Sequence, residues 1–248
     1  MATQLQTVNQ VLRRLRETEV STVGASDYAA LIATFVNDAK EELEDMWFWT
    51  VNETEIDTSI LGDSSTRTYD LTATNDRSFL IRAFDDNVPM MYDITSNENA
   101  QLQDVPLKAI REFRNTSRSI DDTLDQPVNF ALKPDTDGRG WSIELQQASS
   151  SARTWRSYWY APQAQLAVDG TDDATEILLP ARPIYLMALY FAQYERGEAK
   201  PGGFEEQRAH TAAAAAMEID MQTHKKSDQK DMTNLESLRN NLISGNTW

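Results

Sequence analysis

The stretch LPARPIYLMALYFAQYERGE, residues 179–198, decides the fold, because it predicts a helix late in a chain that also begins with helices. Its apolar residues at helical spacing are Ile184, Met187, Ala188, Phe191 and Ala192. Pro183 suits the first turn, where a backbone amide would have no partner within the helix. Gly197 is placed to end the helix, since glycine readily adopts a left-handed backbone. An amphipathic helix is therefore expected here.

Two more helices are expected before residue 50. The apolar stripe of the first is Leu5, Val8, Val11, Leu12 and Leu15. Ser26 or Asp27 caps the second. Its apolar side is Leu31, Ile32, Phe35, Val36, Ala39, Leu43, Met46 and Trp47, and its polar side is Asp38, Lys40, Glu41, Glu42, Glu44 and Asp45. A fourth helix, from Phe204 to about Thr223, is rich in alanine and should pack closely on a neighbouring helix.

Between these helices the apolar period changes to that of strands, from Val51 to Leu178. Two alternating runs on either side of Asp137 and Gly138 predict a hairpin. The aromatic run RTWRSYWYAPQ, residues 153–163, predicts another strand, and a short helix is expected from Leu107 to Phe113. The region is therefore expected to be mostly β.

The order of these elements predicts an α+β fold. We expect a four-helix bundle built from both ends of the chain, with a mostly antiparallel β domain inserted between its halves and an extended C-terminal tail. The expected boundaries are 1–50 and 178–226 for the bundle halves, 51–177 for the β domain and 227–248 for the tail.

Composition narrows the possible functions. The 248 residues include 39 acidic and 23 basic ones, for a net charge of −16, and no cysteine. Disulfides, thiolate metal sites and cysteine nucleophiles are thereby excluded. The acidic balance disfavours wrapping DNA, which requires clustered basic residues. No secretion signal and no apolar run of roughly 20 residues for a membrane span is visible, so we expect a soluble protein without a membrane partner.

Motifs of enzyme chemistry are weak in this sequence. The segment DTDGRGWSIELQ, residues 135–146, begins like a calcium loop, but Arg139 and Gln146 stand where oxygen ligands are needed. The acidic loop DGTDDATE, residues 169–176, has no spacing that defines a coordination sphere, and His210 and His224 lack a metal-binding spacing. We expect no catalytic residues, no metal site and no cofactor. A polysaccharide-degrading enzyme remains an alternative, because carboxylates and aromatic residues are plentiful.

Aromatic residues concentrate in MWFWT, residues 46–50, and in RTWRSYWY, residues 153–160. Arg153 and Arg156 within the second run are also typical of a platform on which nucleic-acid bases or sugars stack. The interpretation favoured for an acidic protein is that alternate residues of this strand face a core, while the arginines and other aromatics face a partner subunit.

Three segments together resemble a known family. They are LQTVNQVLRRLRETEVSTV (residues 5–23), AKEELEDMWFWTVNETEIDTSI (39–60) and ILLPARPIYLMALYFAQYERGE (177–198). They resemble the head-to-tail adaptor, or tail tubular protein A, of short-tailed bacteriophages. That family opens with a helix of the form N-x-x-L-x-x-x-G-E, then a helix ending in W-x-F, and later has a proline-led helix ending in E-R-G-E.

Asn9 and Leu12 match the first motif, whereas Arg16 replaces its glycine, and Trp49 stands beside the usual aromatic of the second. The resemblance covers the two expected halves of the helical bundle, roughly half of the chain. It implies a structural virion protein without catalysis, located in the neck or tail and assembled in the host cytoplasm. Its subunits would form a ring, commonly a dodecamer, between the portal protein and the tail nozzle protein, with genomic DNA passing through the channel unread. A different ring position, such as a stopper or completion protein, remains an alternative.

The last residues, TNLESLRNNLISGNTW (233–248), repeat apolar residues at helical spacing after a very polar stretch. In the family that this chain resembles, the C-terminal extension embraces the portal. The residues expected to bind the portal are Leu235, Leu238, Leu242, Ile243 and Trp248. The alternative is a frayed terminus that contacts nothing.

Overall fold

The computed structural model describes residues 1–71, 74–81, 91–95, 100–116, 123–124, 127–135 and 140–223. The chain divides into two compact units, one of Met1–Val51 with Gln163–Trp248 and the other of Asn52–Pro162. The first unit is helical and the second is mostly β, which confirms the α+β class. No helix in the described ranges is long and apolar enough to cross a membrane.

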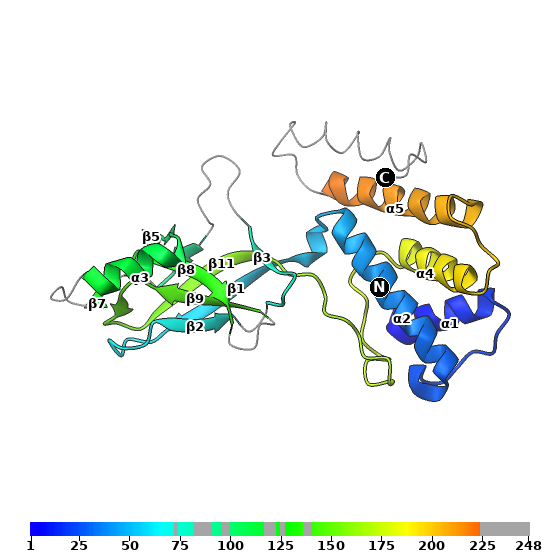
Figure 1. Ribbon diagram of the computed structural model, residues 1–248, viewed down its shortest axis with the longest axis horizontal. Helices are drawn as coiled ribbons and strands as arrows, with labels where there is room; N and C mark the ends of the chain where they lie inside the picture. The colour runs from blue at the N-terminus through cyan, green and yellow to red at the C-terminus, as the bar shows by residue number, and fades with distance from the viewer. Residues whose placement is uncertain are drawn as a thin grey trace. The chain divides into compact units, whose positions relative to one another are not determined.

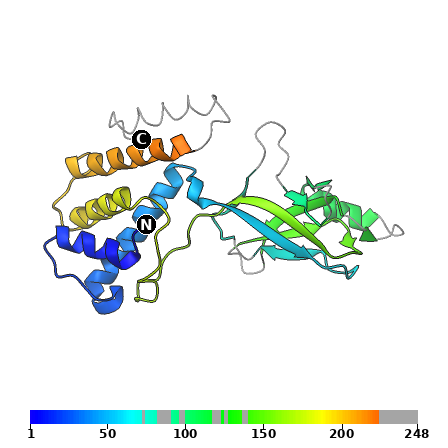
Figure 2. The same ribbon diagram turned by 180° about the vertical axis from the view of Figure 1, so that it is seen from behind.

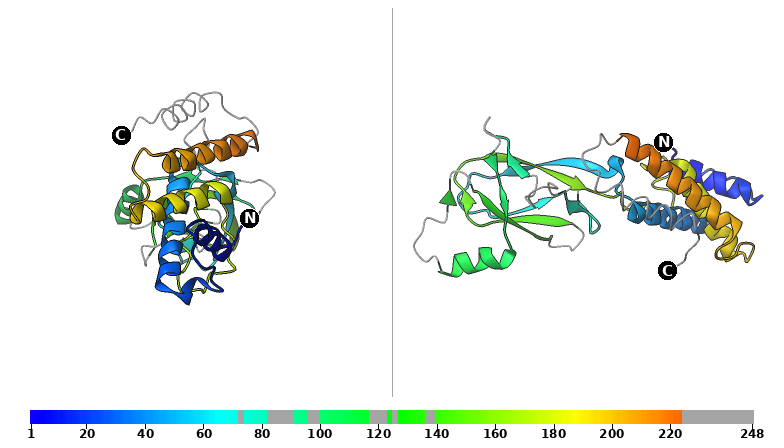
Figure 3. Two further views of the ribbon diagram at one scale, coloured as in Figure 1. Left: turned by 90° about the vertical axis from the view of Figure 1, so that its right-hand side faces the viewer. Right: turned by 90° about the horizontal axis from the view of Figure 1, so that it is seen from above.

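The helical unit is organised around one central helix. Its helices are α1 (Gln4–Arg14), α2 (Asp27–Met46), α4 (Ala181–Glu195) and α5 (Phe204–Thr223), with 3-10 turns η1 (Val23–Ala25) and η2 (Thr50–Asn52). Helix α4 packs against α1, α2 and α5 (Figure 1). Two further views show α5 running alongside α4 (Figure 3), as expected for an alanine-rich helix, and Ala209, Ala213 and Ala216 are buried there.

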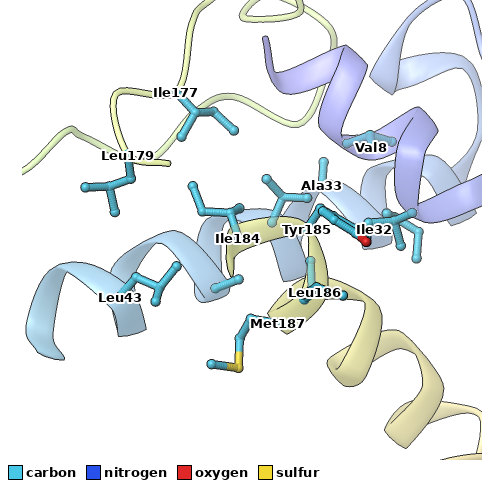
Figure 4. Packing of buried hydrophobic residues seen from close by; sticks show 14 of the residues in the cluster. Val8, Ile32, Ala33, Leu43, Ile177, Leu179, Ile184, Tyr185, Leu186 and Met187 are labelled. Carbon is cyan, nitrogen blue, oxygen red and sulfur yellow. The ribbon is translucent and has the colours of Figure 1, made fainter. Parts of the chain in front are cut away.

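Burial around α4 extends beyond the apolar stripe that the sequence predicts. Ile184, Met187, Ala188 and Ala192 are buried as expected, whereas Phe191 is only half-buried. Pro183, Tyr185 and Leu186 are buried too. Figure 4 shows side chains of α4 packed with Ile32, Ala33 and Leu43 of α2 and with Val8 of α1. Helix α4 is buried on several sides because it has three helical neighbours.

Helix α2 begins where the sequence predicts. The Ser26 hydroxyl accepts a hydrogen bond from the Ala29 amide at 3.1 Å, so Ser26 is the residue that caps it. Leu31 was expected in the apolar stripe but is 39% exposed, whereas Ile32, Val36, Ala39 and Leu43 are buried. The prediction for Leu31 was wrong because the buried face is centred on Ile32 and Val36.

The described residues of the β unit form three sheets. Its strands are β1 (Glu53–Ile60), β2 (Thr68–Leu71), β3 (Phe79–Leu80), β4 (Met91–Asp93), β5 (Ala100–Gln101), β6 (Gln103–Asp104), β7 (Thr123–Leu124), β8 (Asn129–Pro134), β9 (Trp141–Leu145), β10 (Ala148–Ser149) and β11 (Arg153–Tyr160). One sheet has the order β1-β11-β4-β5, with β3 also on β11, another has the order β2-β9-β8-β6, and β7 pairs with β10. Most of the pairs are antiparallel, as expected, while β6–β8 and β7–β10 are parallel.

The longest pairing joins strands far apart in the sequence. Strands β1 and β11 pair antiparallel over eight residues, from Glu53 with Tyr160 to Ile60 with Arg153 (Figure 2). The expected hairpin is confirmed by β8 and β9, which pair antiparallel up to Pro134 with Trp141. Its expected turn residues, Asp137 and Gly138, lie outside the described residues.

The β region predicted from the sequence, 51–177, ends later than the β unit of the structure, Asn52–Pro162. The last strand ends at Tyr160, and residues from Gln163 onward belong to the helical unit rather than to a β domain that continues to residue 177. Leu166, Ile177 and Leu179 contribute to the helical core instead of a sheet. The expected short helix is present as α3 (Leu107–Thr116), longer than the sequence predicts.

Helix α3 is tied to the second sheet by a charged cluster. Glu144, whose side chain is 9% exposed, lies 2.5 Å from Arg114 of α3 and 3.1 Å from Lys133 of β8. Burial by itself raises the pKa of Glu144, but the hydrogen bonds from Lys133 and Arg114 outweigh it and hold that pKa below its ordinary value. The ionised form of Glu144 therefore stabilises the folded state.

We expect Glu144→Gln to lower the free energy of unfolding at pH 7 by about 1–3 kcal/mol. Because the folded-state pKa of Glu144 is lowered, its stabilising effect is complete above the unfolded pKa, about 4.3. The effect then declines as pH falls through the folded-state pKa. Urea unfolding of the unmodified protein and of Glu144→Gln, from pH 7 to pH 3, should show their free energies of unfolding converging as the pH falls. A constant difference across that range would contradict the assignment.

Candidate functional site

The residues of the first family-like motif have specific structural roles at the end of α1. The Asn9 side chain donates to the Val20 carbonyl and accepts from the Val20 amide, both at 2.9 Å. This pair of bonds imitates strand pairing and holds the chain that follows α1 against the helix. Leu12, the second matching residue, is 1% exposed in the helical core. The asparagine and leucine thus stabilise the local fold around α1.

Arg16, at the position of the family's glycine, has a left-handed backbone with φ of 61°. The Arg16 amide donates to the Arg13 carbonyl at 3.2 Å, and the Glu17 amide donates to the Leu12 carbonyl at 2.9 Å. These two bonds define a Schellman motif, whose left-handed residue is most often glycine. The backbone at residue 16 therefore has the conformation that the motif's glycine favours.

The motif at the end of α4 meets the end of α1. Gly197 has φ of 72°, and the amides of Gly197 and Glu198 close a second Schellman motif on the carbonyls of Tyr194 and Gln193. Arg196 lies 2.5 Å from Glu17 and 5.2 Å above the ring of Tyr28 at the start of α2. The arginine of E-R-G-E and the glutamate of the first motif therefore form one contact.

We expect Arg16→Gly to raise the free energy of unfolding by about 0.5–1 kcal/mol, because glycine adopts positive φ without the steric penalty of a side chain. The matched control is Arg14→Gly, in the last turn of α1, which should lower it by about 1 kcal/mol. Chemical denaturation of the two variants checks the opposite signs. A loss of stability in both would show that residue 16 does not need a left-handed backbone.

The aromatic residues after α2 anchor the end of that helix. The Trp49 indole donates to the Leu43 carbonyl at 2.7 Å, and Trp49 is 1% exposed. The Trp47 indole donates to Asp220 of α5 at 2.9 Å, while the Phe48 side chain is 66% exposed. Trp49 therefore belongs to the helical core, and Trp47 packs against that core.

A polar clamp that the sequence did not reveal lies on α2. Lys40 and Glu44 were expected on the polar side of the helix, yet they are 0% and 4% exposed. The Lys40 ammonium donates to the carbonyls of Gln163 and Ala164, the latter at 2.8 Å, and Glu44 accepts from the Gln163 amide at 3.1 Å. The prediction was wrong because the chain returning from the β unit covers this face.

Asn37 extends the clamp by one turn of α2. Its side chain donates to the Leu166 carbonyl at 2.8 Å and accepts from the Leu166 amide at 3.1 Å. The three clamp residues lie at i, i+3 and i+7, so they share one helical face. The only sequence signal was the Lys–Glu pair at i, i+4, which is also common on solvent-exposed faces. We call Asn37, Lys40 and Glu44 the α2 clamp.

The acidic loop before α4 uses its carboxylates to bond its own backbone and that of a neighbouring turn. Asp172 accepts from the Ala167 amide at 2.6 Å, and Asp173 accepts from the Val23 amide at 3.0 Å. A hydrogen bond from Thr171 holds the pKa of Asp169 below its ordinary value. Among the described residues, no group of three or more His, Cys, Asp or Glu side chains could hold a metal ion. Asp169, Asp172 and Asp173 therefore bond backbone amides of the loop and of the neighbouring turn.

The aromatic strand β11 has the buried face that the sequence favoured. Trp155, Ser157 and Trp159 alternate along it and are at most 1% exposed. Arg153 lies 2.7 Å from the buried Asp93, and Arg156 lies 2.8 Å from Asp57. Both arginines are thus held by carboxylates of the same chain, which leaves neither guanidinium in the uncompensated state that a phosphate-binding platform uses.

His210 lies on α5 with its Nε2 3.7 Å from Glu206 of the same helix. Burial raises the pKa of Glu42, which faces this pair from α2. The His210 Nδ1 atom is buried without a hydrogen-bond partner among the described residues. The other histidine, His224, lies outside those residues.

A hollow in the helical unit has mostly apolar walls. Its volume is about 610 Å³, and its lining includes Met1, Trp49, Val51 and Pro180 with the polar side chains of Gln6 and Asp220. Asp220 already accepts hydrogen bonds from Trp47 and from the Thr50 amide. The carboxylate of this lining is therefore already engaged by two hydrogen-bond donors.

The residues expected to bind the portal, Leu235, Leu238, Leu242, Ile243 and Trp248, lie outside the described residues. A scan against models of protein families gives no match for this chain, and a search of curated proteins gives none either.

Proposed function

We propose that this chain is the subunit of a head-to-tail adaptor ring of a short-tailed bacteriophage. In this role it joins the portal protein to the tail nozzle protein and surrounds part of the channel through which genomic DNA leaves. The protein acts structurally, without catalysis or a cofactor, in the neck or tail of the virion. Its subunits assemble into a closed ring, commonly a dodecamer in the family that the sequence resembles.

The observation that carries this proposal is the meeting of the two motifs on which the resemblance depends. Glu17 of the first motif and Arg196 of E-R-G-E form an ion pair, although 179 positions separate them in the sequence. Residue 16 has the left-handed backbone for which the family uses glycine. Accidental matches scattered over a sequence have no reason to form one local structure with complementary roles, so these contacts favour a shared fold.

The finer architecture belongs to the same proposal. Helices α1, α2, α4 and α5 act as a four-helix bundle, and the β unit, Asn52–Pro162, is inserted between its halves. The extension 227–248 leaves the bundle after α5 and binds the portal through Leu235, Leu238, Leu242, Ile243 and Trp248. Apolar residues at helical spacing in a polar segment suit a segment that becomes ordered on a partner.

The net charge of −16 supports a channel protein that does not bind DNA. Acidic side chains repel phosphate, so DNA would pass an acidic lumen without being retained. Clustered basic residues would instead hold the DNA backbone and oppose its exit.

Negative-stain imaging of the purified protein, alone and mixed with a portal ring, tests the proposal. We expect rings that cap the portal with its rotational symmetry. A protein that stays monomeric and leaves the portal unchanged would contradict it. Cleavage of a surface polysaccharide by the purified protein, abolished by one Asp or Glu substitution, would instead favour the enzymatic alternative.

A further inference from the structure

Two strands of the β unit lie at the edges of their sheets, as the described residues define them. Strand β1 is the first strand of the sheet β1-β11-β4-β5, and β2 is the first strand of the sheet β2-β9-β8-β6. A slot of about 380 Å³ is lined by both strands, including Ile56, Asp57 and Ser59 of β1 and Tyr69, Asp70 and Leu71 of β2. Within the described residues, neither strand pairs with the other. The slot is therefore bordered by two unpaired strand edges.

The hydrogen bonds of β11 show which residues of β1 direct their backbone amides and carbonyls away from β11. The carbonyls of Thr154 and Tyr158 accept from Ile94 and Ile81, so these residues face the opposite side of the sheet. Because bonding direction alternates along a strand, Trp155 and Ser157 face β1, where their partners are Thr58 and Ile56.

The residues of β1 between those partners therefore direct their amides and carbonyls outward. Glu55, Asp57 and Ser59 are such residues, and no described residue bonds their backbone on that side. The outward amide of Leu61, next in this series, donates to the Tyr69 hydroxyl at 3.2 Å, which closes one end of the slot. A row of backbone amides and carbonyls without strand partners, such as that of Glu55, Asp57 and Ser59, is a template on which another strand can pair.

A buried polar group in the slot also lacks a partner. Thr58 is 7% exposed, and its hydroxyl oxygen has no hydrogen-bond partner among the described residues. The indole nitrogen of Trp155, the residue paired with Thr58 on β11, lacks one as well. Buried polar groups are normally hydrogen-bonded, so an unpaired hydroxyl beside an open edge indicates an absent partner. A Ser or Thr opposite Thr58 on an added strand would supply that bond.

The charge of the edge indicates which kind of strand can bind there. Glu55 and Asp57 lie on the solvent face of β1, and among the described residues Arg156 pairs with both of them, at 3.4 Å and 2.8 Å. Pairing with β1 of a second copy would place carboxylates opposite carboxylates, which destabilises a strand pair. A strand with Lys or Arg at alternate positions would instead complement this face.

We propose that the outer edge of β1 accepts an extended, basic segment of a different polypeptide by strand addition. The added segment places Lys or Arg over Glu55 and Asp57 and a Ser or Thr opposite Thr58. Its backbone bonds the outward groups of Asp57 and Ser59. This binding does not require the chain to be an adaptor subunit, and its test uses no portal.

The probe is a fluorescein-labelled peptide, acetyl-Lys-Val-Lys-Thr-Lys-Val-Lys-amide, titrated with the full-length protein. Three comparison peptides carry Glu in place of Lys, Val in place of Thr, or N-methyl groups on alternate backbone nitrogens. The N-methylated peptide keeps the charge but loses its strand hydrogen bonds, so it separates strand addition from simple attraction to an acidic protein. We expect the N-methylated and Glu peptides to bind at least about tenfold more weakly than the probe.

Ser59→Pro tests the edge from the protein side. Proline at Ser59 removes an outward amide and leaves the bonds between β1 and β11 in place, which edge strands tolerate. Ser59→Ala is the matched control. We expect probe binding to weaken at least about tenfold in Ser59→Pro and to be unchanged in Ser59→Ala. Equal binding by the probe and its N-methylated form, or by both variants, would overturn the proposal.

Hydrogen exchange of the unmodified protein gives a readout that does not depend on a variant. We expect the amides of Asp57 and Ser59 to become protected when the probe is added, while the amides of Thr58 and Ile60 change little. Unchanged exchange at Asp57 and Ser59 with saturating probe would also overturn the proposal, even if the peptide binds elsewhere.

Discussion

Lys40→Met should lower the free energy of unfolding by about 3–5 kcal/mol, the loss expected when one partner of a buried ion pair is removed. Lys40 is fully buried, and its ammonium lies 4.0 Å from the Glu44 carboxylate. Methionine fills a similar volume but leaves Glu44 charged in the core. It also leaves the carbonyls of Gln163 and Ala164 without the lysine donor. Urea denaturation at pH 7 measures the change.

The matched control is Lys108→Met on α3. Lys108 and Glu112 are also a Lys–Glu pair at i, i+4, at 3.6 Å, but both side chains are mostly exposed. We expect a change of at most about 0.5 kcal/mol, as is usual for an exposed pair on a helix. Adding Glu44→Gln to Lys40→Met should recover part of the lost stability, because glutamine removes the unpaired charge and still accepts from the Gln163 amide. Similar losses in Lys40→Met and Lys108→Met would show that the α2 clamp does not hold the returning chain.

Deletion of residues 227–248 should weaken binding to the portal by at least about 100-fold, the second large effect that we expect. Each large apolar side chain that becomes buried on a partner contributes about 1.5–3 kcal/mol, so the loss of several exceeds the 2.7 kcal/mol of a hundredfold change. The described core clusters of the two units run from Val8 to Ala216 and from Ile56 to Trp159, so we expect the thermal midpoint of the truncated protein to match that of the full chain. Binding to an immobilised portal ring measures the affinity.

Point substitutions distinguish the contribution of the apolar side chains to portal binding from the effect of removing the whole extension. We expect Leu235→Ala with Leu238→Ala and Leu242→Ala to reproduce most of the loss. The matched control, Asn234→Ala with Asn240→Ala and Asn241→Ala, changes polar residues of the same segment and should retain binding. If the truncated protein binds the portal ring as tightly as the full chain does, the prediction that the extension binds the portal is wrong.

Much of the helical unit could be predicted because its signals are local. The stripe of α1, the Ser26 cap of α2 and the Pro183 start and Gly197 end of α4 each depend on residues within a few turns of one another. The hairpin of β8 and β9 was also predictable, since its two runs are adjacent. These are the elements for which nearby residues specify the backbone.

The pairing of β1 with β11 could not be predicted in this way. About 100 residues separate the two strands, and alternation shows only that each has two faces, not which partner it has. The same limit explains the boundary at the end of the β unit. Residues from Gln163 onward are polar and irregular in sequence, and the α2 clamp binds them to the helical unit.

Of the candidate site, the sequence indicated the motif residues Asn9, Leu12 and Arg16 but not their contacts. In the sequence, Arg16 looks like an ordinary basic residue after a helix. Only its φ angle of 61° shows that its backbone has the left-handed conformation that glycine favours. The pairing of Glu17 with Arg196 depends on how α1 and α4 pack. Side chains on separate elements meet only after those elements have packed together.

By itself, the sequence determined the α+β fold class, the approximate positions of the helices, the acidic charge and the absence of cysteine chemistry. Periodicity, capping and composition act over a few residues, so a linear chain carries them fully. Tertiary structure decided that Lys40 and Glu44 lie in the interior, that α4 is buried on several sides, and that β1 lies at the edge of its sheet among the described strands. Burial and pairing depend on which distant segment covers a face, and local spacing does not encode that choice.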